Sequence, residues 1–278
     1  MEQNRERRLI VNADDFGRSR DINEAVVRAH REGILTTASL MVNGGAFEEA
    51  VTLARENPKL GVGLHLTLLC GTSALSSQQI PGLVNEKGEF SNAPAMTGMR
   101  YFFKKNLAKQ LEEEIAAQFE KFHATGLPLD HVNGHLHIHL HPTVFKILMR
   151  RADEWKIRHL RWTRDDFGLS VRMTSGKWFY RTSHAIIYKS LSAWARPELV
   201  KRNISHTQIV FGLLQNARVN ENYVAQLLPQ LPAGDSELYS HPSLDKFKHE
   251  FDALVSPENK DLVQQLGIKL IRYQDLQL

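Results

Sequence analysis

The sequence predicts a single α/β domain over residues 1–278, a (β/α) barrel-like fold that is TIM-like and either incomplete or distorted. Three observations predict it. About eight short apolar runs alternate with helical segments, an order typical of parallel strands joined by crossover helices. A length of 278 residues suits one large α/β domain. The turn G-x-G-x-x-G, which marks the rival open doubly wound sheet, does not follow the first apolar run, and no composition break marks a linker.

The first half of the chain contains four of the predicted strands, at residues 8–12, 35–42, 60–66 and 129–133. The helices between them have apolar residues at helical spacing. We expect the first to begin at Asp21 as N-cap and to end at Gly33, and the next two to span 46–55 and 106–123. A loop at about 71–100 is rich in Gly, Ser and Pro. We expect it to act as a lid, because long loops inside compact domains are usually functional.

The second half of the chain continues the alternation. A helix is predicted at 142–155, strands at 158–162, 207–211, 237–240 and 269–271, and helices near 220–230, 245–254 and 258–265. The segment 177–202 is basic and rich in aromatic residues, with Glu198 as its one acid. Such a segment is typical of a membrane-surface contact, and an ordinary barrel helix with a solvated basic face is the alternative.

The composition excludes several classes of protein. With 42% hydrophobic and 24% charged residues, the chain is neither disordered nor collagen-like. The charged N-terminus and the lack of an apolar run of about 18 residues predict a soluble, cytoplasmic protein. A net charge of +4 argues against uniform nucleic-acid binding. The single cysteine, Cys70, cannot form an internal disulfide and fits a reducing compartment.

Polar residues collect where the predicted strands end, which is where barrel enzymes place their chemistry. These residues are Asp14, Asp15, His65, His135, His137, His139 and His241. A catalytic divalent-metal site needs about three protein ligands and an open position, and one Asp with two His satisfies this. The alternate spacing of the histidines from 135 to 141 predicts that they share one side of an extended segment. Only one or two of them can then reach the same ion as His65.

Asp14 and Asp15 are adjacent carboxylates that would repel each other unless a cation lies between them or one is protonated. A metal resolves the repulsion if one ligates it and the other stays free as a general base. A solvated turn that caps a helix is the alternative for these residues. The same four letters recur at 165–168, which we interpret as coincidence. A kinase is excluded because neither a Gly-rich loop nor a His-Arg-Asp motif accompanies them.

Four stretches of this sequence, at 11–17 (VNADDFG), 63–65, 133–139 and 241–242, carry a family resemblance in their order and spacing. They resemble the YdjC-like family of metal-dependent carbohydrate deacetylases, to which chitooligosaccharide deacetylase belongs. Residues 33–42 and 127–133 are similar to one branch of that family, the hopanoid-biosynthesis-associated HpnK branch. The resemblance covers nearly the whole chain and is weakest between about 163 and 205.

The resemblance implies a barrel-like fold and hydrolysis of an N-acetyl group from an amino sugar. By position it implies Asp15, His65 and His135 as the metal ligands and Asp14 as the base. The family often has Asp-Ser-His-His-His-Val-His where this chain has NGHLHIH at 133–139, so Asn133 replaces an acidic residue while His135 is intact.

The remaining site residues are assigned by their chemistry. His241 is the expected acid for the leaving amine, because imidazole can carry a proton near neutral pH; ordering a loop before Pro242 is its alternative role. Arg161 and Arg164 are expected to bind substrate hydroxyls, with surface solvation as the alternative. His137 and His139 are expected to orient the metal ligands from behind. Two nitrogens and one carboxylate favour Zn²⁺ or another transition ion, and the resemblance also allows Mg²⁺.

The expected substrate is an N-acetylglucosaminyl glycolipid of hopanoid biosynthesis, presented at the inner membrane that the protein would contact peripherally. Soluble chitooligosaccharides are the alternative substrate. A metal- or sugar-binding regulatory protein and a metal phosphoesterase stay open as other functions. No nucleic-acid partner is expected, and a homodimer is left open.

Overall fold

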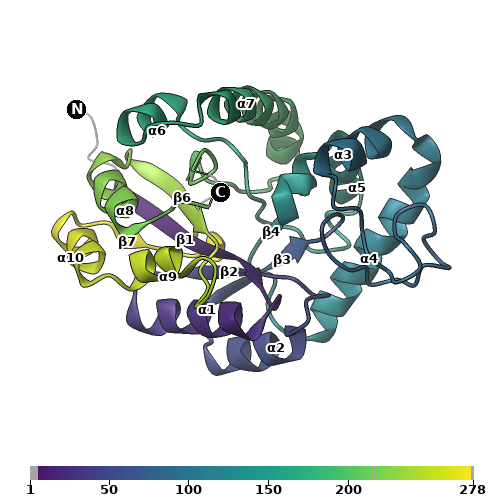
Figure 1. Cartoon of the computed structure of the whole chain (residues 1–278), viewed down its shortest axis with the longest axis horizontal. Helices are drawn as coiled ribbons and strands as arrows, with labels where there is room; N and C mark the ends of the chain where they lie inside the picture. The colour runs from purple at the N-terminus through teal and green to yellow at the C-terminus, as the bar shows by residue number, and fades with distance from the viewer. Residues whose placement is uncertain (1–5, 216, 277–278) are drawn as a thin grey trace.

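The computed structural model describes residues 6–215 and 217–276, and its centre is a seven-stranded parallel sheet (Figure 1). The strands are β1 (Arg7–Phe16), β2 (Thr37–Leu40), β3 (Gly61–Leu66), β4 (Val132–Gly134), β5 (Ile209–Phe211), β6 (Gly234–Ser240) and β7 (Lys269–Leu270). Their order is β4-β3-β2-β1-β6-β5, with β7 also paired to β1. Every pair is parallel, as the alternation of strands and helices predicts.

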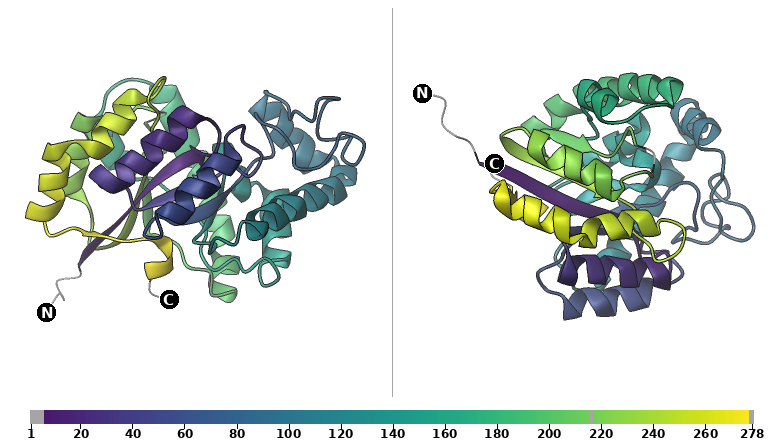
Figure 2. Two further views of the ribbon diagram at one scale, coloured as in Figure 1. Left: turned by 90° about the horizontal axis from the view of Figure 1, so that it is seen from below. Right: turned by 60° about the vertical axis from the view of Figure 1, so that its left-hand side comes forward.

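The sheet curls into an incomplete barrel with helices around it (Figure 2). The extended segment 158–164 lies between the two ends of the strand order. Isolated bridges join Leu160 to Val132 and His159 to Ser205, and the backbone N–H of Val210 donates to the Arg164 carbonyl at 2.7 Å. The strand predicted at 158–162 is therefore an irregular extended segment, and the predicted single-domain, TIM-like architecture is confirmed in its incomplete form.

The surrounding helices match most of the predicted ones. They are α1 (Arg20–Glu32), α2 (Phe47–Glu56), α4 (Ala108–Ala124), α5 (Pro142–Arg150), α8 (Glu221–Leu227), α9 (Lys248–Val255) and α10 (Pro257–Gln265). Gly33 ends α1 as predicted, but its N-cap is Ser19 and not Asp21. Ser19 has an extended backbone and its side chain accepts from the N–H of Ile22, whereas Asp21 lies inside the first turn.

The predicted loop at 71–100 is partly helical. Its last residues belong to α3 (Pro94–Phe103), where Pro94 occupies the first turn. The irregular part is anchored to α4 by Glu114, a buried carboxylate that accepts the backbone N–H groups of Ala74 and Leu75. Burial raises the pKa of Glu114, against these hydrogen bonds, which lower it.

The histidine run after β4 is not extended, contrary to the prediction. It forms a 3₁₀ segment, η2 (His135–Leu140), in which Leu136 and His137 have left-handed backbones with φ of 49° and 59°. The turn begins at Gly134, where a Cβ would lie 3.1 Å from the backbone nitrogen of His139. A glycine therefore lets the chain fold back over the strand end, and the histidines point in different directions.

Two further helices, α6 (Phe167–Met173) and α7 (Trp178–Lys201), lie on one side of the barrel (Figure 1). The second of them is the segment predicted at 177–202. Within the described ranges, no helix combines the length and apolar character that crossing a membrane requires.

The alternation of side chains along β1 divides the core from the barrel interior. Leu9, Val11 and Ala13 belong to the main apolar cluster, which lies between the sheet and the helices. The residues between them face the other way, where Ile10 packs with Tyr273 and where Asn12 and Asp14 are buried among polar side chains. The polar interior therefore begins at Asn12, four residues before the end of this strand.

We predict that Gly44→Ala destabilises the protein and that Gly45→Ala does not. A Cβ at Gly44 would lie 2.1 Å from the carbonyl oxygen of Gly17, but one at Gly45 would lie 3.7 Å from its nearest neighbour, the Arg18 oxygen. Overpacking of this kind costs about 1–3 kcal/mol. Thermal unfolding followed by circular dichroism should show a lower Tm for Gly44→Ala alone, and equal Tm values in the two variants would contradict the packing described.

Candidate metal centre

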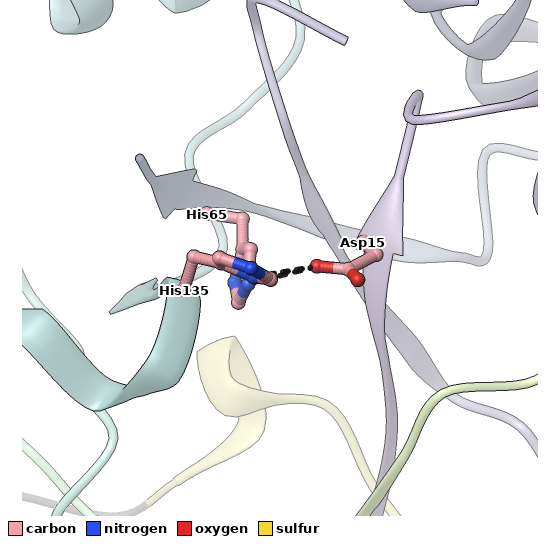
Figure 3. Close-up of side chains that lie close together, drawn as sticks. All are labelled: Asp15, His65 and His135. Carbon is pink, nitrogen blue, oxygen red and sulfur yellow. Dashed lines mark hydrogen bonds and ion pairs between the residues drawn. The ribbon is translucent and has the colours of Figure 1, made fainter. Parts of the chain in front are cut away.

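Three side chains from three strand ends converge at the carboxyl edge of the sheet (Figure 3). Asp15 comes from β1, His65 from β3 and His135 from the start of η2. One ligand atom of each lies within 4.8 Å of the others. Asp15 Oδ1 is 3.0 Å from His135 Nδ1 and 3.3 Å from His65 Nε2. All three side chains are buried, so the cluster is a site built by the fold.

A bulge at the end of β1 allows Asp14 and Asp15 to serve the same site. The pairing of β1 with β2 shifts register between Ala13 and Phe16, and Asp15 has a left-handed backbone with φ of 66°. In a regular strand the two carboxylates would point to opposite faces. The bulge instead turns Asp15 toward the histidines while Asp14 stays in the barrel interior.

Asn133 holds His65 in one orientation. His65 Nδ1 lies 2.7 Å from the Asn133 amide oxygen, and because that oxygen only accepts, the ring donates its Nδ1 proton there. The Nε2 lone pair is then free to face Asp15 and His135. The Asn133 amide nitrogen donates to Asp14 and Ser39. Asn133 therefore orients two site residues at once.

The electrostatics of this cluster favour ionised carboxylates and a positive charge beside them. Burial disfavours ionised Asp15, but its hydrogen bonds and Coulombic attraction with His135 and His65 outweigh burial and hold its pKa well below the usual range. Burial lowers the pKa of His65, but the charges of Asp14 and Asp15 outweigh it and raise that pKa. Positive charge is thus stabilised between these carboxylates. The donor set and its charge fit a divalent cation.

Arg161 occupies a different position from the one predicted. Its side chain is completely buried, so it is directed at carboxylates and not at a substrate. Two of its nitrogens donate to Asp14, at 2.7 and 2.9 Å, and its Nε donates to Glu237 at 2.9 Å. Although burial alone would raise the pKa of Asp14, the charge of Arg161 outweighs it and holds that pKa far below the usual range.

Further buried polar residues support Asp14 and were not predicted. Glu237 on β6 accepts from the hydroxyl of Tyr273, whose ring stacks on His131 at 4.4 Å. His131 contacts Ser39, which in turn contacts Asn12 and Asn133 beside Asp14. The one sequence signal was Glu237 itself, a carboxylate at the start of a predicted strand.

His241 lies at the end of β6 beside a second buried carboxylate. Its Nδ1 is 3.8 Å from an oxygen of Glu250, which also accepts the backbone N–H groups of His241 and Val219. The His241 side chain is 25% exposed, while Glu250 is fully buried. The His241 ring packs against Tyr239, with ring centroids 5.4 Å apart, and the Arg161 guanidinium that binds Asp14 lies over the same Tyr239 ring at 4.8 Å.

The other predicted residues lie around this centre. His139 is buried and its Nε2 contacts the Arg161 carbonyl at 3.0 Å; burial lowers its pKa to about 3. The His137 ring packs between Tyr188 of α7 and Tyr239 of β6. Arg164 is exposed and its guanidinium lies over the Trp162 ring, 5.4 Å from the ring centroid.

The second Asp-Asp-Phe-Gly tetrapeptide, at 165–168, begins helix α6. Asp166 caps α6 by accepting the N–H of Leu169. One Asp165 oxygen accepts the N–H of Leu214, and within the described ranges the other, buried oxygen has no partner. Burial raises the pKa of Asp165 to about 7, although its hydrogen bond with Leu214 lowers it.

A family model described as YdjC-like protein matches residues 8–265. The chain is 43% identical over 150 residues to a carbohydrate deacetylase of Brevibacillus brevis, a match that covers 54% of this chain and 57% of that protein. It thus spans little more than half the length of that relative. It is 28% identical over 284 residues to carbohydrate deacetylase 2 of Listeria innocua, covering 97% of this chain and 98% of the relative.

A similar fold occurs in a solved structure from Enterococcus faecalis V583, provisionally described as a cellobiose-phosphate cleavage protein. The TM-score is 0.74 and the identity 22%, with 98% of this chain and 100% of that chain covered. This likeness concerns the fold alone.

We predict that Asp165→Asn becomes more stable relative to the parent protein as pH rises from about 4 to about 7. The parent carboxyl keeps its proton in the folded state up to about pH 7 but loses it near 3.8 when unfolded. Its stability therefore falls across that window, by up to about 1.4 kcal/mol per pH unit. Urea unfolding at several pH values measures the difference. Asp166→Asn is the matched control, since Asn caps helices as well as Asp; a pH-independent difference for Asp165→Asn would contradict the assignment.

Proposed function

This chain belongs to the YdjC-like protein family, and from that membership and the geometry of its site we propose that it is a metal-dependent carbohydrate N-deacetylase. Its reaction is hydrolysis of the N-acetyl group of an N-acetylglucosaminyl substrate. The observation that carries the proposal is the convergence of Asp15, His65 and His135 beside a separately held carboxylate, Asp14. The relatives named carbohydrate deacetylase support the choice of reaction.

Asp15, His65 and His135 are the proposed ligands of one divalent cation. The preset orientation of His65 supports this, because its Nδ1 is engaged by Asn133 and only Nε2 faces the other two ligands. The donor set favours Zn²⁺ or another transition ion, and Mg²⁺ stays open. When bound, such a cation lowers the pKa of water and polarises the acetyl carbonyl.

Asp14 is the proposed general base, and its two oxygens are differently occupied. Oδ1 accepts from Asn12, Asn133 and Arg161, whereas Oδ2 accepts one N–H, from Arg161. Oδ2 therefore keeps the capacity to accept the proton of the attacking water. Arg161 keeps Asp14 ionised at neutral pH, so the base is in its active form before the substrate arrives.

His241 is the proposed acid that protonates the departing amine nitrogen. It is partly exposed, it directly follows β6, and Glu250 lies on its Nδ1 side. A proton on Nδ1 faces that carboxylate, which leaves Nε2 as the atom that donates to the substrate. Arg164, exposed over Trp162, is the proposed contact to sugar hydroxyls.

We propose a hopanoid glycolipid as the substrate and a cytoplasmic location for the protein. The similarity of residues 33–42 and 127–133 to the hopanoid-associated branch supports this choice. A soluble chitooligosaccharide is the second candidate, which the name carbohydrate deacetylase of the relatives favours.

We predict that the purified protein releases acetate from an N-acetylglucosaminyl substrate and that His65→Ala abolishes both this release and binding of a divalent cation. Removing the imidazole leaves two ligands, fewer than a catalytic metal site requires. The measurements are an enzymatic acetate assay and metal analysis of the same samples. Full activity in a metal-free His65→Ala preparation would refute the proposed site.

His123→Ala is the matched control, since His123 is exposed on α4 and should leave both readouts unchanged. Running the assay on diacetylchitobiose and on an N-acetylglucosaminyl lipid in parallel separates the two candidate substrates. Metal binding without acetate release from any such substrate would favour a regulatory protein.

We predict that Asn133→Ala weakens divalent-cation binding by about 10- to 100-fold, the usual cost of losing a residue that orients a metal-binding histidine. The His65 ring loses its acceptor in this variant, while all three proposed ligands remain. Isothermal titration with Zn²⁺ measures the affinity, with the exposed Asn92→Ala as control. Equal affinities in the two variants would show that Asn133 does not orient His65 for the cation.

A further inference from the structure

The exposed large hydrophobic side chains of the described residues are confined to four neighbouring segments. Twelve such side chains are at least 38% exposed: four on α3, one on η2, one on α6 and six on α7. Phe103 at the end of α3 is 74% exposed, and Phe179 near the start of α7 is 89% exposed. We call this set, from residues 96–103, 136 and 167–200, the apolar rim. Scattered apolar exposure is normal, but confinement to one region marks an interaction surface.

The apolar rim lies beside the segment that leads into the candidate metal centre. The segment η2, which begins with the proposed ligand His135, lies between the two main helices of the rim. Tyr188 of α7 packs against His137, with ring centroids 5.3 Å apart, and Phe102 of α3 packs against His141 at 6.4 Å. Helices α3 and α7 both contact α5 (Figures 1 and 2). A surface that binds the rim would therefore lie next to the segment that carries His135.

The charged side chains of the apolar rim are basic except for Glu198, which pairs with Arg202. The chain has 31 acidic residues, yet the stretches 90–111 and 167–197 contain none, while they contain four and five basic residues. Lys104, Lys189 and Arg196 are among the exposed ones. Two copies of this chain docked rim to rim would bring like charges together, whereas an anionic lipid surface complements both the basic and the apolar side chains.

We propose that the apolar rim docks the protein onto an anionic lipid bilayer, with Phe103 and Phe179 inserted among the lipids. Docking in this orientation turns the candidate site toward the membrane surface. An N-acetylated sugar carried on a lipid would then reach Asp14 and His241 without leaving the bilayer, a consequence that rests on the proposed function. The docking itself rests on the exposed residues and their charge.

Vesicle flotation of the full chain tests the proposal. Equimolar phosphatidylcholine and phosphatidylglycerol vesicles should bind the protein at low salt, and binding should weaken in high salt because the charges are screened. Vesicles of phosphatidylcholine alone should bind less. The double variant Phe103→Ser with Phe179→Ser should lose about tenfold or more in partitioning, since two aromatic side chains no longer enter the lipid.

Two charge reversals at exposed lysines, one on the rim and one away from it, test the docking independently of whether the aromatic double variant folds. Lys189→Glu on α7 should reduce partitioning by about fivefold or more. Lys59→Glu should not, because Lys59 is exposed just before β3, at the opposite end of the strands from the site. Equal effects of the two reversals would show that overall charge, and not the apolar rim, governs binding.

The outcomes separate this proposal from the catalytic one. His65→Ala should float like the parent protein, and acetate release from soluble diacetylchitobiose measures the chemistry without lipid. Docking is overturned if the parent protein does not bind the anionic vesicles, or if the double variant binds them equally well. It is also overturned if the double variant changes only the oligomeric state, as an interface between two copies would require.

Discussion

The buried ion pair between Arg161 and Asp14 is the interaction on which the interior of this fold depends. A guanidinium with no exposed surface is tolerated only among carboxylates, and Asp14 on β1 and Glu237 on β6 provide them. Removing one partner would leave the others as uncompensated buried charges. The ion pair therefore connects the extended segment that carries Arg161 to the two strands β1 and β6. It also fixes the position of Asp14 in the barrel interior.

Adjacent residues acquire different chemistry from their surroundings at the end of β1. Asp14 is bound by Arg161, Asn12 and Asn133, all of them hydrogen-bond donors in the barrel interior. Asp15 is turned outward by the bulge and contacts two imidazoles. The bulge in β1 thus gives two neighbouring aspartates different surroundings. Asp15 is suited to holding a cation and Asp14 to accepting a proton.

The carboxyl end of the barrel has a polar interior and an apolar exterior, the apolar rim. Inside, Asp14 is held by several hydrogen bonds, and some bonds of this network join residues more than ninety positions apart, such as Asn133 with Asp14 and with Ser39. Outside, α3 and α7 bury one side against the domain and leave aromatic side chains in solvent. The interior is held by specific hydrogen bonds, while the rim carries the apolar side chains that we propose for lipid docking.

Local patterns in the sequence determined the alternation of strands and helices, the barrel-like class and the convergence of Asp15, His65 and His135, because strand ends of a parallel sheet share one edge. The tertiary structure decided what each of these side chains faces. It showed that the histidines of η2 diverge because the chain turns at Gly134, that Arg161 is buried against Asp14, and that Asn133 orients His65. These contacts follow from strand order and register, which place residues 68 and 147 positions apart within hydrogen-bonding distance, and no spacing along the chain encodes such a distance.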